Sequence, residues 1–132
     1  VLVISLDFLA NDGDTISLPA ADACLQTVTR AVAGAMKRTT DLVARHGPHR
    51  LVVMMPETDR HGASLAAQRV VDGVALLTLP HPDTEQAPKV TASVGVAGWV
   101  PRSREDGELL VCEAESAQEY ARLEGGNRIG MA

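Results

Sequence analysis

The sequence predicts an α+β fold in which helices pack on one face of a mainly antiparallel sheet. Three observations predict it. Segments with strand and helix patterns follow one another as β-α-β-β-α-β-α-β, two of the strands form a hairpin, and the helices are amphipathic. The chain is 132 residues long, a common size for a single domain, and contains no repeat or internal linker. We therefore expect one domain over residues 1–132.

The first half is expected to contain a strand, a helix and a hairpin. Val1–Phe8 is apolar and β-branched at its start, as in a buried strand. Apolar residues then recur at helical spacing within Ala20–Met36. Asp41–Arg45 and Arg50–Met55 read as two short strands, because four turn-prone residues separate them. Pro56 ends the second strand, since proline cannot donate a ladder hydrogen bond.

The second half is expected to contain a helix, a strand, a helix and a short edge strand. In that order, these elements are Ala63–Val74, Val90–Trp99, Ser103–Leu123 and Asn127–Met131. Thr58 or Asp59 can cap the first of these helices, and Gly125 and Gly126 can end the second. The resulting arrangement is a ferredoxin-like α+β sandwich.

Composition excludes several classes of function. Twelve Lys and Arg residues against 17 Asp and Glu residues give a net charge of −5, which argues against a nucleic acid polymer as a partner. Aromatic residues make up 2% of the chain, too few for a base-stacking surface. Only two cysteines are present and no apolar run approaches the ~20 residues that span a bilayer, so we expect a cytoplasmic location.

Three segments together carry a resemblance to a known family. They are the hairpin over residues 41–56, the late strand over 90–97, and the closing helix with its glycine turn over 109–128. In this order and spacing they resemble the GGDEF family, the diguanylate cyclase domains of bacterial signalling. The resemblance implies a palm-type sheet with flanking helices. The family's usual first helix has no counterpart here, so we expect a fragment of a longer multidomain protein.

The resemblance also implies that metal-dependent cyclase chemistry is lost, so that the domain is degenerate. Joining two GTP molecules needs divalent metals, which the family holds with acids of the first strand and the signature turn. Ser5 stands at the first of these positions, and Pro48, His49 and Arg50 occupy the turn. His46 and His49 could supply two imidazoles, but no third ligand is near in sequence. We therefore expect no enzymatic activity, no catalytic residue, no metal and no cofactor.

Other positions of the family's nucleotide site are mixed. Gly13 and Gly126 stand where the family has a guanine-reading asparagine and a phosphate-binding arginine. Asp22 and Arg122 match its guanine-reading aspartate and phosphate-binding lysine, which leaves GTP binding open as a weaker hypothesis. Asp7, the second acid of the first-strand motif, is expected to be structural.

Arg38 and Asp41 form an Arg-x-x-Asp motif just before the hairpin. An arginine fork can meet the O6 and N7 acceptors of guanine, and a carboxylate can accept from its N1–H and N2–H₂ groups. The motif resembles the family's inhibitory site for cyclic di-GMP, and Arg69 matches an arginine that completes that site. We therefore expect Arg38, Asp41 and Arg69 to bind cyclic di-GMP, as a stacked pair that bridges protomers into a homodimer.

Two hypotheses of different classes follow. In the first, the domain is an inactive receptor for cyclic di-GMP that regulates a partner or an attached domain. In the alternative, it is a nucleotide-free dimerisation or protein-interaction module that retains only the fold. Loss of ligand binding on Arg38→Ala separates the two.

Overall fold

The computed structural model describes residues 1–7, 18–36, 38–47, 49–80 and 89–132. Its elements are β1 (Leu2–Leu6), α1 (Leu18–Ala35), β2 (Leu42–Arg45), β3 (Arg50–Met54), α2 (Arg60–Leu76), β4 (Ala92–Val96), α3 (Arg104–Leu123) and β5 (Arg128–Met131). The predicted α+β class and order of elements are confirmed. The first and fourth strands are shorter than predicted, and Phe8 lies outside the described residues.

The strands form one five-stranded sheet in the order β2-β3-β1-β4-β5. β1 lies at its centre and pairs antiparallel with both β3 and β4. The predicted hairpin is present as the antiparallel pair of β2 and β3. β5 is an edge strand, as predicted, and runs parallel to β4.

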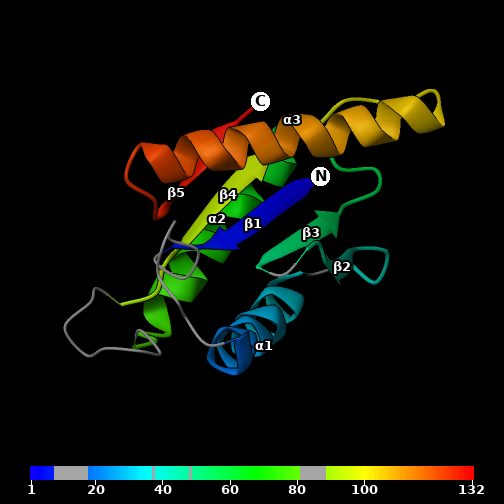
Figure 1. Ribbon diagram of the computed structural model, residues 1–132. Helices are drawn as coiled ribbons and strands as arrows, with labels where there is room; N and C mark the ends of the chain where they lie inside the picture. The colour runs from blue at the N-terminus through cyan, green and yellow to red at the C-terminus, as the bar shows by residue number, and fades with distance from the viewer. Residues whose placement is uncertain (8–17, 37, 48, 81–88) are drawn as a thin grey trace.

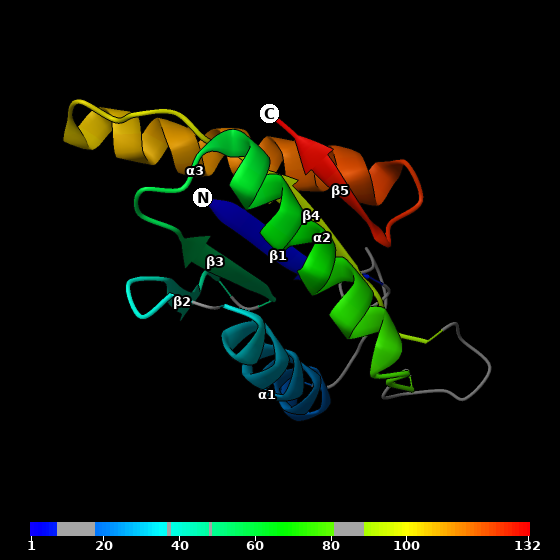
Figure 2. The ribbon, with the colours of Figure 1, turned by 180° about the vertical axis from the view of Figure 1, so that it is seen from behind.

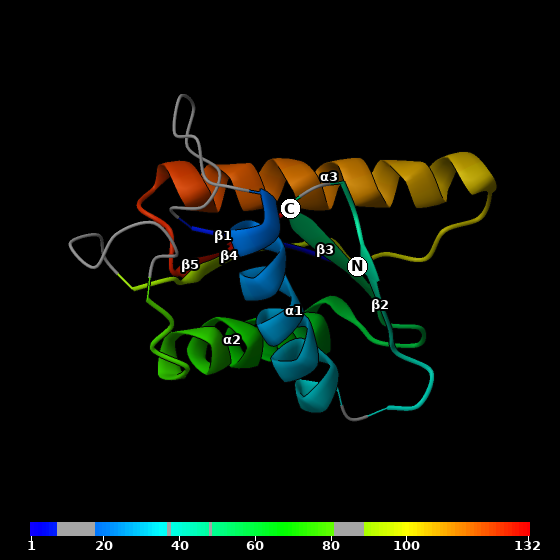
Figure 3. The same cartoon turned by 60° about the horizontal axis from the view of Figure 1, so that its bottom comes forward.

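The helices cover both faces of the sheet, so the prediction of a single covered face is wrong. α3 lies across the face seen in Figure 1, and α1 and α2 lie behind it, as the reverse view shows. The view in Figure 3 separates these layers. The physical reason is that all five residues of β1, and all five of β4, are buried. Strands of that kind need cover on both sides.

The core on the α1 and α2 side is built from large aliphatic side chains. Its members include Leu2, Ile4, Val28, Val32, Leu51, Val53, Val70 and Val74. The α2 residues predicted to face the core, Ala63, Ala66, Ala67, Val70 and Val74, are all buried. Among the described residues, no helix has the length and apolar character needed to cross a bilayer.

The layer between α3 and the sheet is thinner than the core on the α1 and α2 side. Its buried cluster consists of Val3, Ala97, Leu110 and Ala114. Close approach depends on glycine, because a Cβ on Gly95 would lie 1.9 Å from the Ala114 carbonyl oxygen. Gly130 of β5 meets the carbonyl of Ala117 in the same way, at 2.2 Å.

Helix ends follow the predicted chemistry. Asp59 is the N-cap of α2, and its side chain accepts from the Gly62 amide. Ser103 caps α3 through the Asp106 amide. Thr58, the other predicted cap of α2, makes a different contact that is described below.

Candidate functional site

The three residues of the predicted ligand site line one hollow of about 480 Å³. The remaining lining residues are Met55, Glu57, Thr58, Asp59 and Gly62. Arg38 and Asp41 lie in the turn between α1 and β2, and Arg69 lies on α2. The other side chains belong to the β3–α2 turn and the start of α2.

The α1–β2 turn holds the arginine and the aspartate close together. The Asp41 amide donates to the Arg38 carbonyl at 3.1 Å, the bond that closes a four-residue turn. Two residues with complementary charges are thereby presented from one turn, beside the first turn of α2. The spacing of the Arg-x-x-Asp motif is explained by this geometry.

The Arg38 guanidinium contacts the β3–α2 turn. Its Nη1 donates to the Thr58 hydroxyl at 2.8 Å and to the Glu57 carbonyl at 3.2 Å. Its Nη2 lies 3.8 Å from the Glu57 carboxylate. Sequence reasoning did not single out Glu57, and it named Thr58 only as a possible cap of α2. The position of both residues directly after Pro56 was the available signal.

Asp41 has a buried oxygen that lacks a partner. Within the described part of the chain, no group donates to its Oδ1, although that atom is shielded from solvent. A buried acceptor without a donor costs about 1–3 kcal/mol, so native proteins pair nearly all such atoms. A ligand with N–H groups could supply the missing donor.

Arg69 completes the hollow from α2 with an exposed side chain. None of the described residues forms a hydrogen bond or ion pair with it. The lining carries Arg38 and Arg69 against Asp41, Glu57 and Asp59, a formal charge of 2 − 3 = −1. The Asp59 carboxylate is engaged in capping α2, where it accepts from Gly62 at 2.7 Å.

The positions at which the family holds metal ions carry other groups. Ser5 lies directly opposite Arg50 in the β1–β3 register. The Ser5 hydroxyl is buried and accepts from Nε2 of Gln118 at 2.5 Å. Pro48 and Gly13 lie outside the described residues. Among those that are described, no three His, Cys, Asp or Glu side chains gather as a metal site requires.

Asp7 occupies a fully hydrogen-bonded position at the end of β1. Its carboxylate accepts from the Thr91 and Ser93 hydroxyls, both at 2.6 Å, and from the Asn127 amide at 2.8 Å. A Cβ on Gly126 would lie 2.7 Å from this carboxylate, and Gly126 has a φ of +74°. No larger side chain fits there, so the glycine and the buried aspartate are coupled.

The other candidate residues Asp22, Arg122 and His46 have partners among the described residues. Asp22 accepts from Arg45 at 2.8 Å, and Arg122 pairs with Glu119 at 2.6 Å. This pairing lowers the pKa of the Glu119 carboxyl. His46, from the β2–β3 turn, pairs with Glu115 of α3.

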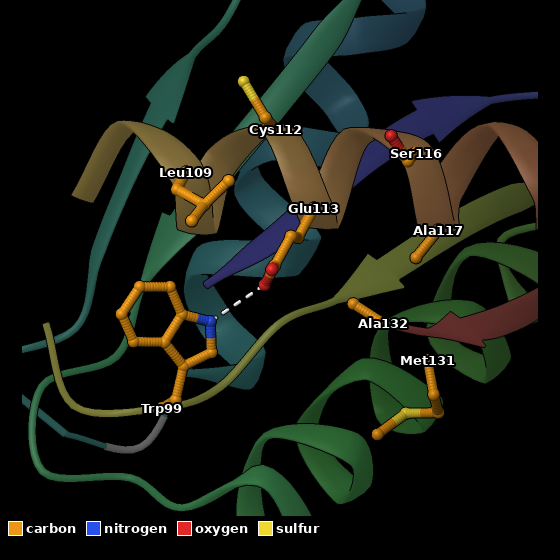
Figure 4. A pocket seen from close by; sticks show the side chains of 8 residues that line it. All are labelled: Trp99, Leu109, Cys112, Glu113, Ser116, Ala117, Met131 and Ala132. Atoms are coloured by element: carbon orange, nitrogen blue, oxygen red, sulfur yellow. Dashed lines mark hydrogen bonds between the residues drawn. The ribbon is translucent and has the colours of Figure 1, made fainter. Parts of the chain in front are cut away.

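A second, larger hollow of about 750 Å³ lies beside α3 and the end of β5. Figure 4 shows its lining, which includes none of the residues predicted for function. The indole of Trp99 forms one wall, and its Nε1 donates to Glu113 at 2.8 Å. Among the described residues that line this hollow, there is no pair of oppositely charged side chains and no buried polar atom without a hydrogen-bond partner.

Comparisons with known proteins identify the family. The model described as diguanylate cyclase, GGDEF domain, matches residues 1–128. Diguanylate cyclase A of Treponema denticola is 27% identical over 132 residues, which cover 100% of this chain and 34% of that protein. The chain thus spans about a third of the length of this curated relative.

Solved structures show the same fold. The diguanylate cyclase SiaD of Pseudomonas aeruginosa, in complex with its activator SiaC, has a TM-score of 0.77 and 28% identity, over 99% of this chain and 49% of that one. The coiled coil and GGDEF domain of DgcB from Caulobacter crescentus, in complex with c-di-GMP, has a TM-score of 0.78 and 19% identity. That match covers 99% of this chain and 68% of the solved DgcB chain.

The prediction that the chain is not an enzyme is corrected by these comparisons. Relatives that match over 98–100% of its length are named diguanylate cyclase or probable diguanylate cyclase. The prediction rested on Ser5, Pro48, His49 and Arg50. These four residues differ from the groups that the family carries at individual positions of its metal site. The similarity to cyclases, in contrast, extends over residues 1–128.

Proposed function

The chain belongs to the GGDEF family, and from that premise we propose that it binds cyclic di-GMP in the hollow lined by Arg38, Asp41 and Arg69. The observation that carries the proposal is that Asp41, which lines this hollow with two arginines, has a buried Oδ1 with no donor among the described residues. The c-di-GMP complex of DgcB supports the choice of ligand by family likeness.

The chemistry of each side chain matches one part of the ligand. A guanine Watson–Crick edge offers N1–H and N2–H₂ donors, which the Asp41 carboxylate can accept. Arg69 has all of its guanidinium donors available within the described residues, and it can meet O6 and N7 or a phosphate bidentately. Arg38 contributes the donors that the β3–α2 turn does not use.

Several finer statements stay predictions. They are a stacked pair of ligands per site, ligand-linked homodimerisation, regulation of an attached domain or partner, and the place of this domain in a longer cytoplasmic protein.

Diguanylate cyclase activity is a second candidate function, supported by the whole-length match to proteins of that name. Its test is the formation of cyclic di-GMP from GTP with Mg²⁺, compared with an enzyme-free sample.

Isothermal titration calorimetry of cyclic di-GMP tests the binding site. Wild type should bind in about the micromolar range, and Arg38→Ala or Asp41→Asn should weaken binding by about ten- to a hundredfold. Arg104→Ala is the matched control, because Arg104 is exposed on α3 outside the hollow and should bind as wild type does.

Two outcomes would contradict the proposal. One is the absence of heat at protein concentrations of tens of micromolar, which would favour the nucleotide-free interaction module. The other is wild-type affinity in both site variants, which would place the ligand elsewhere. GTP runs beside these titrations show whether the hollow distinguishes the cyclic dinucleotide from a mononucleotide.

A further inference from the structure

We propose that two neighbouring residues of the β3–α2 turn set the affinity of this hollow in opposite directions. Glu57 competes with the ligand for Arg38 and weakens binding, whereas Thr58 positions Arg38 and strengthens binding. The inference rests on the proposed function and extends it, because it concerns how the unliganded chain restrains the same site.

Glu57 places a carboxylate where the ligand needs positive charge. Its Oε2 lies 3.8 Å from Nη2 of Arg38, and its side chain is 88% exposed. Cyclic di-GMP carries two phosphodiester groups, each negatively charged. Glu57 therefore attracts the guanidinium in the free protein and repels the phosphates as the ligand approaches. Removing this carboxylate changes the formal charge of the lining from −1 to zero.

Thr58 acts on the same guanidinium through a neutral group. Its hydroxyl accepts from Nη1 of Arg38 at 2.8 Å and lies 3.3 Å from the Pro56 carbonyl, to which it donates. The second bond fixes the hydroxyl proton, so that an oxygen lone pair is left for Arg38. Because Thr58 holds only Nη1, it leaves Nε for a ligand, and Nη2 faces the exposed Glu57 carboxylate, with which the ligand would compete.

The backbone at Glu57 indicates that the turn itself is specified. Glu57 has a φ of +55°, in the left-handed region that non-glycine residues seldom adopt. Its carbonyl also accepts from Arg38 at 3.2 Å. Glutamate and glutamine have the same shape and no special preference for this region, so Glu57→Gln removes the charge and leaves the turn as it is.

The test compares three variants with wild type by titration calorimetry with cyclic di-GMP. Glu57→Gln should bind about two- to fivefold more tightly, the range expected for loss of one exposed charge interaction. Thr58→Val should bind several-fold more weakly, since it keeps the methyl group and removes the acceptor. Glu105→Gln is the charge-matched control, because Glu105 is an exposed residue of α3 outside the hollow.

The outcomes separate this inference from the proposed function. If wild type binds and Glu57→Gln binds equally or more weakly, competition by Glu57 is refuted while the site stands. Equal tightening in Glu57→Gln and Glu105→Gln would also refute it, because the effect would then reflect net charge alone. If Thr58→Val binds as wild type does, the positioning role is refuted. Absence of binding by wild type, with circular dichroism showing a folded chain, would refute the proposed function itself.

Discussion

Replacement of Gly95 by alanine should separate α3 from the sheet. Gly95 is the fourth of the five residues of β4, and a Cβ there would lie 1.9 Å from the Ala114 carbonyl oxygen and 2.4 Å from the Gln118 amide nitrogen. Ordinary contact begins at 3.4 Å, so the shortfall against the carbonyl is 3.4 − 1.9 = 1.5 Å. Both obstructing atoms belong to helix backbone and cannot turn away.

The magnitude follows from what must move. Overpacking with one methyl group usually costs about 1–3 kcal/mol, when side chains can adjust. Here α3 must shift as a body, which loosens Leu110 and Ala114 against Val3. We therefore expect Gly95→Ala to lower the free energy of unfolding by about 3 kcal/mol or more. This is a large part of the total free energy of unfolding of a typical domain, which is ~5–15 kcal/mol.

Urea unfolding followed by circular dichroism measures this change. Gly73→Ala is the matched control, since Gly73 is within α2 and has no atom within 4 Å of its added Cβ. It should raise the free energy of unfolding by about 0.5–1 kcal/mol, because alanine favours helix over glycine. A loss below about 1 kcal/mol in Gly95→Ala would refute the close packing of α3 on β4.

Three further predictions concern single side chains. Asp59→Ala removes the N-cap of α2 and should lower the free energy of unfolding by about 1 kcal/mol, as measured by urea denaturation. Burial raises the pKa of the Cys24 thiol, so exposed Cys112 should react first with a thiol reagent in a mass-spectrometric time course. Arg122→Ala should return the lowered pKa of Glu119 towards its ordinary value in an NMR titration. In wild type, the stabilisation from this pair is fully present above the ordinary pKa of a glutamate and is lost as the pH falls through the lowered pKa.

The sequence predicted the order of elements better than their layering. Alternation at Val90, Ala92, Val94 and Val96 was read as one buried face, and these residues do face the larger core. The intervening Ser93 and Gly95 are buried as well: Ser93 donates to the Asp7 carboxylate, and Gly95 meets the backbone of α3. A serine and a glycine do not look like core residues, so within β4 the covered second face carried no hydrophobic signal.

In the candidate site, too, some features could be predicted from the sequence and others could not. The proximity of Arg38 and Asp41 follows from their spacing in one turn, which local sequence can predict. Arg69 came from family resemblance and lines the same hollow. The contacts of Arg38 with Glu57 and Thr58 join residues 19 and 20 positions apart. Such contacts depend on how the β3–α2 turn packs beside α1, which no local pattern encodes.

A crystal structure of the chain grown with cyclic di-GMP tests the central claim most directly. The account predicts a guanine edge on the Asp41 carboxylate and a guanidinium of Arg38 or Arg69 on guanine or phosphate, inside the hollow at the start of α2. Ligand bound instead at the β2–β3 turn near His49 and Arg50, with the hollow open in the same crystal, would contradict it.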